Sequence, residues 1–117
     1  MNRLALLLET TKAIPEDHFN MGSFFEGVDD VKEGTKLLKD CGTSGCVIGW
    51  ACCHPKFVGL RKRLQEDWFN AGYSHYVATL SFAKYFGISR HQAEELFFNF
   101  DQTKQEAIKR IERLLCK

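Results

Sequence analysis

CGTSGCVIGWACC, residues 41–53, is the stretch that decides how the 117-residue chain folds. It holds four of the five cysteines and three of the nine glycines, so small side chains line its backbone. A glycine inside a helix is destabilising by about 0.5–1 kcal/mol relative to alanine, unless a close contact compensates. We therefore predict that a neighbouring segment packs directly on Gly45 or Gly49, and that Trp50 is largely buried.

The ends of this helix are predicted from the residues around it. Thr43 or Ser44 can cap its start, and Pro55 ends it near His54 because the residue before a proline avoids helical backbone. Buried cysteines behave as small hydrophobic residues, so we expect Cys46 to lie in the core. The residues assigned to this structural motif are Cys41, Gly42, Thr43, Cys46, Gly49 and Trp50.

The cysteines allow two other interpretations. Cys41, Cys46, Cys52, Cys53 and His54 are potential metal ligands, but structural zinc sites use two close pairs that are distant from each other. Here Cys41 and Cys46 are five residues apart, and there is no second distant pair. The start of a helix also lowers the pKa of a thiol, which would suit a reactive Cys41 or Cys46. We favour the packing interpretation and predict no metal site and no cofactor.

Apolar residues at helical spacing continue on both sides of this stretch. Two capping boxes, Ser89 with Gln92 and Thr103 with Glu106, predict helix starts, and Gly87 predicts a helix end. No segment alternates apolar and polar residues as a strand would, so we predict an all-α single domain, a compact bundle of about five to six short helices. Within this domain of residues 1–117, the expected helices cover about residues 2–13, 44–54, 57–68, 76–86, 90–98 and 104–115.

Two segments lack helical periodicity. Residues 16–27 are aromatic but aperiodic, and we expect an ordered loop whose aromatic side chains hold it to the core. Residues 28–40 are polar, and we expect a surface connection with a short helical turn near residues 35–39. A small two-stranded β-hairpin between Phe19 and Thr35 is the alternative for this region.

Composition and charge limit the functions available. The net charge is +1, so whole-chain electrostatics favour neither nucleic acid nor an acidic membrane surface. The N-terminal apolar run, Leu4 to Leu8, is too short for a membrane span. An odd number of cysteines, bunched in one segment, is typical of reduced thiols rather than of a secreted disulfide framework. We therefore expect a cytoplasmic protein without membrane association.

Aromatic residues are abundant, with ten Phe, three Tyr and two Trp. So many rings compete for the core of a small domain that we expect at least one on the surface. An exposed ring is a typical anchor for association with another protein, or with a second copy of the chain. The competing interpretation is that every ring packs onto the core. The residues assigned to protein binding are Phe24, Phe25, Phe98 and Phe100.

Three motifs follow one another along the chain. They are FNMGSFF at Phe19 to Phe25, CGTSGCVIGWA at Cys41 to Ala51 and YFGISRHQAEELF at Tyr85 to Phe97. In this order they resemble a group of small, uncharacterised bacterial and phage proteins that have a CGTxxCxxGWA-like segment. The resemblance implies a compact α-helical domain in a bacterial or phage setting, and it carries no catalytic residues over.

Three functional hypotheses follow from these features. The leading one is a small, non-enzymatic interaction protein of phage or mobile-element type, which binds and modulates a host protein and could inhibit a defence system. The second is a small thiol- or metal-dependent enzyme or redox sensor that uses Cys41 and Cys46. The third is a helical module that binds nucleic acid through basic residues such as Arg61, Lys62 and Arg63, although interleaved acidic residues weaken that field.

Overall fold

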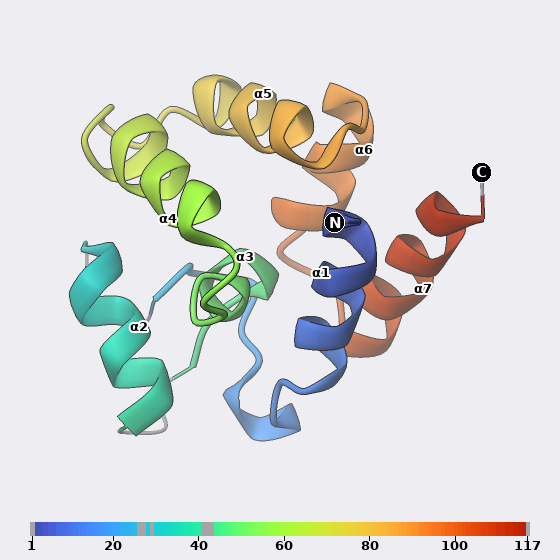
Figure 1. Cartoon of the computed structure of the whole chain (residues 1–117), viewed down its shortest axis with the longest axis horizontal. Coiled ribbons are helices and arrows are strands. Elements are labelled where there is room, and N and C mark those ends of the chain that lie inside the picture. The colour runs from blue at the N-terminus through green and yellow to red at the C-terminus, as the bar shows by residue number, and fades with distance from the viewer. Residues whose placement is uncertain (1, 26–27, 29, 41–43, 117) are drawn as a thin grey trace.

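The structure, a computed structural model, describes residues 2–25, 28, 30–40 and 44–116. Within these ranges it contains seven α-helices, one 3-10 helix and one π-helix (Figure 1). The all-α prediction is confirmed, with one helix more than expected. In chain order the elements are α1 (Arg3–Lys12), η1 (Glu16–His18), α2 (Val31–Asp40), α3 (Val47–Ala51), α4 (Val58–Leu64), the π-helix η2 (Gln65–Phe69), α5 (His75–Phe86), α6 (Arg90–Phe97) and α7 (Lys104–Leu115).

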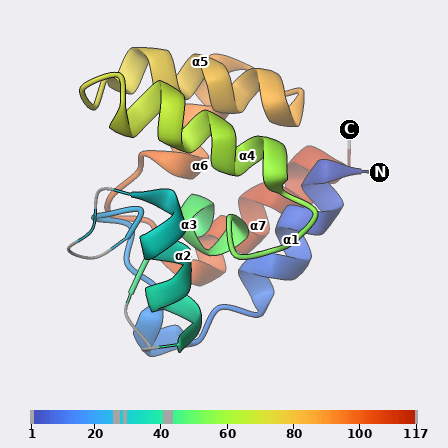
Figure 2. The same ribbon diagram turned by 60° about the vertical axis from the view of Figure 1, so that its left-hand side comes forward.

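The shortest helix, α3, lies at the centre of the molecule, and the longer helices surround it (Figures 1 and 2). It contacts α1 and α2, while α1 lies along α7 and α5 contacts both α4 and α6. Among the described residues, no helix combines the length and the apolarity that crossing a bilayer requires. The cysteine-rich stretch is therefore the centre around which the helices pack.

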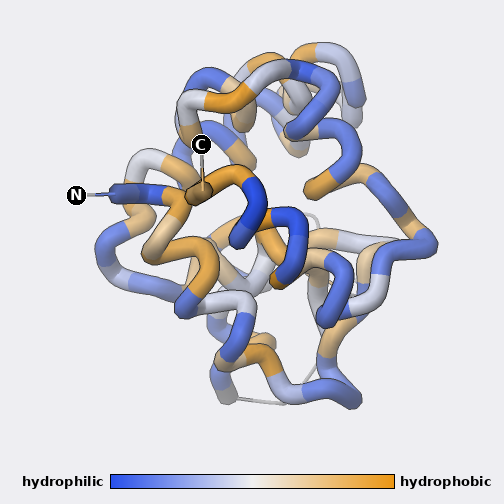
Figure 3. The backbone as a smooth tube through the Cα atoms, turned by 90° about the vertical axis from the view of Figure 1, so that its right-hand side faces the viewer, coloured by the Kyte–Doolittle hydropathy of each residue, from blue (hydrophilic) through white to orange (hydrophobic). Residues whose placement is uncertain are grey.

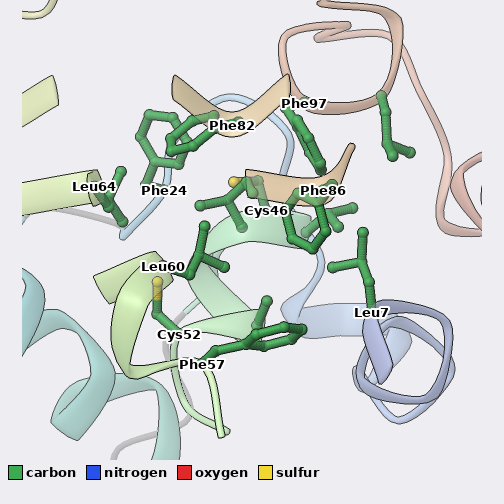
Figure 4. Close-up of a cluster of buried hydrophobic side chains, with 14 of the residues drawn as sticks. Leu7, Phe24, Cys46, Cys52, Phe57, Leu60, Leu64, Phe82, Phe86 and Phe97 are labelled. Atoms are coloured by element: carbon green, nitrogen blue, oxygen red, sulfur yellow. The ribbon is translucent and has the colours of Figure 1, made fainter. Parts of the chain in front are cut away.

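One core unites these helices, and Phe57, Phe82 and Phe97 are the largest of its fully buried side chains (Figure 4). Hydrophobic and hydrophilic residues alternate along the helices, as expected for amphipathic helices around a shared core (Figure 3). Burying a side chain as large as phenylalanine contributes about 1.5–3 kcal/mol relative to leaving it in water. The core also contains Cys46 and Cys52, which confirms that Cys46 is buried.

The predicted caps in the C-terminal half are confirmed. The Thr103 hydroxyl accepts from the backbone N–H of Glu106 at 3.1 Å, and the Glu106 carboxylate accepts from the backbone N–H of Thr103 at 2.9 Å. The bond from the Thr103 N–H lowers the pKa of Glu106, because it favours the charged carboxylate. Ser89 starts α6 with the same reciprocal pair of bonds. Gly87 ends α5 in the left-handed region, with a φ of 70°.

Helix α2 is the element that the sequence analysis missed, since residues 28–40 were expected to form a surface connection. Most residues of this helix are polar, but one narrow face is buried. Val31, Thr35 and Leu38 lie on that face. Gly34 belongs to the same face, and a Cβ atom there would lie 2.2 Å from the ring of Phe25. The helix therefore forms because the aromatic loop packs on it, which no local pattern in its own sequence shows. Within the described ranges the alternative hairpin is absent, and one parallel bridge pairs Phe19 with Gly45.

Helix α3 is shorter than predicted at both ends. It begins after Cys46, which occupies the N-cap position without a side-chain hydrogen bond, and it ends at Ala51 rather than near His54. The prediction that Thr43 or Ser44 caps it is wrong for Ser44, and Thr43 lies outside the described residues. The backbone before the helix instead pairs with the aromatic loop. Gly45 donates to the His18 carbonyl at 3.0 Å, Cys46 donates to that of Ser23 at 3.0 Å, and Asn20 donates to that of Gly45 at 2.9 Å.

Candidate functional site, an aromatic pocket

The described residues form a pocket of about 300 Å³ whose walls are mostly aromatic. All four residues that the sequence analysis assigned to protein binding line this one pocket, although they come from two segments far apart in the chain. Pockets that bind small groups are usually apolar and concave in this way. The lining residues are Met21, Gly22, Ser23, Phe24, Phe25, Val28, Cys46, Trp68, Phe69, Tyr73, His75, Phe97, Phe98 and Phe100.

The four predicted residues have different roles in the pocket. Phe24 and Phe25 are 8% and 4% exposed, so they form its inner wall rather than a surface patch. Phe98 is half-buried. Phe100 is 59% exposed, which confirms that at least one of the four rings lies on the surface. Only Phe100 could contact a partner without any rearrangement of the wall.

Phe24 is the centre of the aromatic cluster. Its ring centroid lies 5.2 Å from that of Trp68, 5.8 Å from that of Phe98 and 6.1 Å from that of Phe82. All three contacts are edge-to-face, the arrangement that aromatic quadrupoles favour. The pocket wall and the hydrophobic core are therefore continuous through this one side chain.

The glycines of the cysteine stretch position Phe24. A Cβ atom at Gly49 would lie 1.9 Å from the carbonyl oxygen of Phe24, and one at Gly45 would lie 2.6 Å from the same atom. The predicted close approach at Gly45 and Gly49 is confirmed, and the approaching segment is the backbone of the aromatic loop. Trp50 is only half-buried, so its predicted extensive burial is wrong. Its indole N–H instead reaches the surface loop and donates to the His18 carbonyl at 3.0 Å.

A π-helix presents two further rings to the pocket. In η2 the backbone N–H of Asn70 donates to the Gln65 carbonyl at 2.8 Å, which widens the last turn after α4 by one residue. Trp68 and Phe69 lie on this widened turn and both line the pocket. Single π-turns are uncommon and occur frequently at functional sites.

Tyr73 has the second unusual backbone conformation at this site. Its φ is 64°, the one positive value recorded for a non-glycine residue in the described part of the chain. A left-handed conformation at such a residue is destabilising by about 1–3 kcal/mol and persists where the surrounding structure requires it. Here the Tyr73 N–H donates to the Trp68 carbonyl at 2.9 Å, and the Tyr73 ring lies 5.4 Å from the Trp68 ring. Two strained segments thus meet at the pocket.

His75 is the polar ring of the pocket. Its imidazole lies 4.7 Å from the Phe98 ring, 5.2 Å from Trp68 and 6.2 Å from Phe100. No Asp, Glu, Lys or Arg among the described residues lines the pocket. The described lining therefore offers ring faces, ring edges and a few polar groups.

The thiol at the base of the pocket is unsuited to nucleophilic chemistry. Cys46 is 2% exposed, and desolvation raises its pKa from 9.0 to about 11. Burial also raises the pKa of Cys53 to about 11 and that of Cys52 well above its ordinary value. The lowering that a helix start could provide is outweighed, because α3 is short and the thiol is excluded from water. Cys41, the other residue of the thiol hypothesis, lies outside the described residues, as does Gly42.

Thiol alkylation tests this assignment. We expect iodoacetamide at pH 8 to modify the exposed Cys116 in the native protein, and Cys46 at least about 100-fold more slowly, since Cys46 is 2% exposed and a pKa of about 11 leaves only about a thousandth of it as thiolate. Peptide mapping by mass spectrometry measures both rates, and denatured protein provides the control in which both cysteines react. Native labelling of Cys46 at the rate of Cys116 would instead support the reactive-thiol hypothesis.

The metal and nucleic-acid hypotheses gain no support from the described residues. No group of three or more His, Cys, Asp or Glu side chains is arranged to hold an ion within them. Of the basic residues named in the nucleic-acid hypothesis, Lys62 is exposed, whereas Arg61 and Arg63 are half-buried. Arg61 donates to the Cys52 carbonyl, and Arg63 donates to the Ser81 hydroxyl at 3.2 Å. These hydrogen bonds engage both guanidinium groups within the protein, so they are less available to contact the phosphates of a nucleic acid.

The sequence analysis did not single out Phe69, Tyr73 or His75. The signal that could have found them is DWFNAGYSHY, Asp67 to Tyr76, where five of ten residues are aromatic or histidine. The run spans the end of the π-helix, where Asn70 is the C-cap. A dense aromatic run across a turn is therefore a better indicator of a ring-lined site than either feature alone.

No known family model, curated protein or solved structure matches this chain. The class of protein is therefore described from its fold and its pocket alone. It is a small all-α domain with one aromatic pocket, which is built on a π-turn and a left-handed tyrosine.

Proposed function

We propose that this is a small interaction protein of phage or mobile-element type, which binds a host protein through the aromatic pocket and its exposed rim. The observation that carries the proposal is the position of Phe100, a ring 59% exposed at the edge of an apolar pocket. Exposed aromatic side chains beside a concave apolar site are typical anchors of protein association. The phage setting rests on the resemblance of the sequence motifs, and inhibition of a host defence system is the expected consequence of binding.

The surface beside the pocket supports the same proposal. Tyr73 is 47% exposed at the rim, and Tyr76 is 64% exposed one helical position after His75. Tyr76 and Leu80, which are four residues apart in α5, are both exposed, whereas Ala78 and Phe82 are buried. Large apolar residues that share one region of a surface indicate an interaction site more strongly than the same residues scattered singly.

The alternative functions have less support. A thiol enzyme or sensor requires a reactive sulfur, and burial raises the pKa of Cys46 to about 11. A nucleic-acid module requires unpaired basic side chains on one face, and the chain carries a net charge of only +1. A cytoplasmic location fits the proposed host partner, and self-association through the same rings remains the alternative use of the pocket.

Affinity capture from bacterial host lysate tests the proposal. We expect the immobilised full-length protein to retain a specific host protein, and Phe100→Ala to lower its recovery about tenfold or more, since loss of a central aromatic anchor is worth about 2 kcal/mol. Val58→Ala is the matched control, because Val58 is 66% exposed at the start of α4 and does not line the pocket. Equal recovery by the wild-type protein and Phe100→Ala, measured by quantitative mass spectrometry, would contradict the proposal.

A further inference from the structure

We propose that the segment from Gln65 to Tyr73 is a movable wall of the aromatic pocket, which exchanges between the π-turn described above and a regular α-turn. The α-turn form would carry the rings of Trp68 and Phe69 out of the pocket. This inference concerns the pocket itself and does not depend on what binds there. It is supported by the geometry of the π-turn, by the backbone of Tyr73 and by the side chain of Gln65.

The π-turn determines where two of the pocket rings lie. The Asn70 N–H donates to the Gln65 carbonyl, five residues before it, at 2.8 Å. In an α-turn the bond runs to the residue four positions before, so the α-turn form has one residue fewer in this turn. Each residue of an α-helix turns the chain by about 100°, so Trp68 and Phe69 would rotate by up to that angle relative to α4. Both rings line the pocket, and both would therefore leave its wall.

The backbone of Tyr73 favours the α-turn form. Its φ is 64°, and the φ of Gly72 before it is 77°. Glycine adopts this conformation readily, whereas for tyrosine it lowers the population by a factor of about five or more. In the α-turn form the extra residue would pass into the turn of Asn70, Ala71 and Gly72, all exposed at the surface. Tyr73 would then be able to take an ordinary backbone conformation.

Ring contacts favour the π-turn form by a similar amount. Trp68 lies edge-to-face with Phe24 at 5.2 Å, and Phe69 is stacked on Phe25 at 6.1 Å. Trp68 and Phe69 are only half-buried, so the core does not lock either ring in place. One aromatic pair corresponds to about two- to tenfold in population, the same order as the effect of the Tyr73 backbone. Because the opposing contributions are alike in size, we expect a minor form with a population between about 0.1 and 10%.

The side chain of Gln65 holds the π-turn form in place. Its Oε1 accepts from the Val31 N–H at 2.9 Å, and its Nε2 donates to the Asn70 Oδ1 at 2.9 Å. Residues five positions apart lie about 140° apart around an α-helix, so the bond to Asn70 requires the wider π-turn. One amide thus joins the start of α2 to the wall of the pocket, and its bond to Asn70 exists in one form only.

Fluorine relaxation-dispersion spectra of the full chain, labelled with fluorotryptophan, test the inference. The chain has two tryptophans, so each gives one signal. We expect exchange on the μs–ms timescale at Trp68. Trp50 is the internal control, because its indole N–H donates to the His18 carbonyl at 3.0 Å and it does not line the pocket. Its signal should show no such exchange.

Two substitutions of Tyr73 form the decisive comparison. Tyr73→Ala and Tyr73→Gly both remove the ring, and only alanine keeps the cost of a positive φ. We expect the ratio of α-turn to π-turn form to be at least about fivefold higher in Tyr73→Ala than in Tyr73→Gly. Gln65→Glu keeps the acceptor for Val31 and loses the donor to Asn70, so it should raise the ratio at least about twofold. Gln105→Glu makes the same change in charge at an exposed position of α7 and should leave the ratio unchanged.

Deletion of Asn70 supplies a reference for the α-turn form, because it removes the extra residue. We expect the Trp68 signal of this variant to match the shift of the minor form in the wild type. If the shortened chain does not fold, the alanine and glycine variants still decide the matter. Absence of exchange at Trp68 in both the wild type and Tyr73→Ala would show that the wall is fixed and would overturn the inference. Equal ratios in Tyr73→Ala and Tyr73→Gly, or the same exchange at Trp50 as at Trp68, would overturn it as well.

Discussion

Phe24→Ala is expected to lower the free energy of unfolding by about 3–5 kcal/mol, the range for loss of a buried phenylalanine. Phe24 is 8% exposed, and its ring contacts Trp68, Phe82 and Phe98 at once. Its removal would leave a cavity that joins the core to the aromatic pocket. A domain of this kind has about 5–15 kcal/mol of stability in total, so the variant should be close to unfolding at 37 °C.

Urea denaturation followed by circular dichroism measures this effect. Phe100→Ala is the matched control, because the Phe100 ring is 59% exposed and its loss should change stability by no more than about 0.5 kcal/mol. The sequence alone placed both residues in one class of binding aromatics, whereas the structure separates them. A Phe24→Ala protein that is as stable as the wild type, yet loses its partner, would show that Phe24 belongs to the interface.

Gly49→Ala is expected to destabilise the protein by about 3 kcal/mol through overpacking. From the sequence we predict that the larger change, Gly49→Leu, destabilises by about 1–3 kcal/mol through overpacking. The structure shows that a single methyl group is sufficient, because its carbon would lie 1.9 Å from the Phe24 carbonyl oxygen and 2.9 Å from the carbonyl carbon. Backbone atoms cannot rotate away as a flexible side chain can, so either α3 or the aromatic loop must move.

Gly59→Ala provides a helical glycine for comparison. A Cβ atom at Gly59 would meet only the edge of the Tyr85 ring, at 3.0 Å, and alanine is the better helix former by about 1 kcal/mol. We expect this variant to remain within about 1 kcal/mol of the wild type. Thermal and urea unfolding of both variants measure the difference, and a Gly49→Ala protein as stable as Gly59→Ala would show that α3 and the loop are not held in contact.

The sequence indicated several residues of the candidate site, but it did not indicate that they lie together in one pocket. Aromatic excess indicated that rings such as Phe24 and Phe100 would bear on function, yet only the fold brings both to one pocket. Trp68 lies on the π-turn, and its position in the pocket depends on the extra residue of that turn. A π-turn has no simple sequence pattern, since it depends on the packing around it.

Local chemistry explains which features the sequence determined by itself. The capping boxes at Ser89 and Thr103, the left-handed end at Gly87 and the all-α class each follow from bonds or sterics within a few residues. The small residues around Gly49 likewise required a close neighbour, because a glycine in a helix is otherwise destabilising. These interactions are short in range, so a single sequence contains the information for them.

Tertiary structure alone decided the rest. It made a helix of residues 31–40 because the ring of Phe25 packs on Gly34, and it shortened α3 because the aromatic loop pairs with Gly45 and Cys46. The tertiary packing also determines which aromatic side chains are buried in the core and which remain exposed at the rim of the pocket. Each of these outcomes depends on contacts between segments distant in the chain. Such contacts are decided by how side chains of particular volume fill one shared core, which no local pattern specifies.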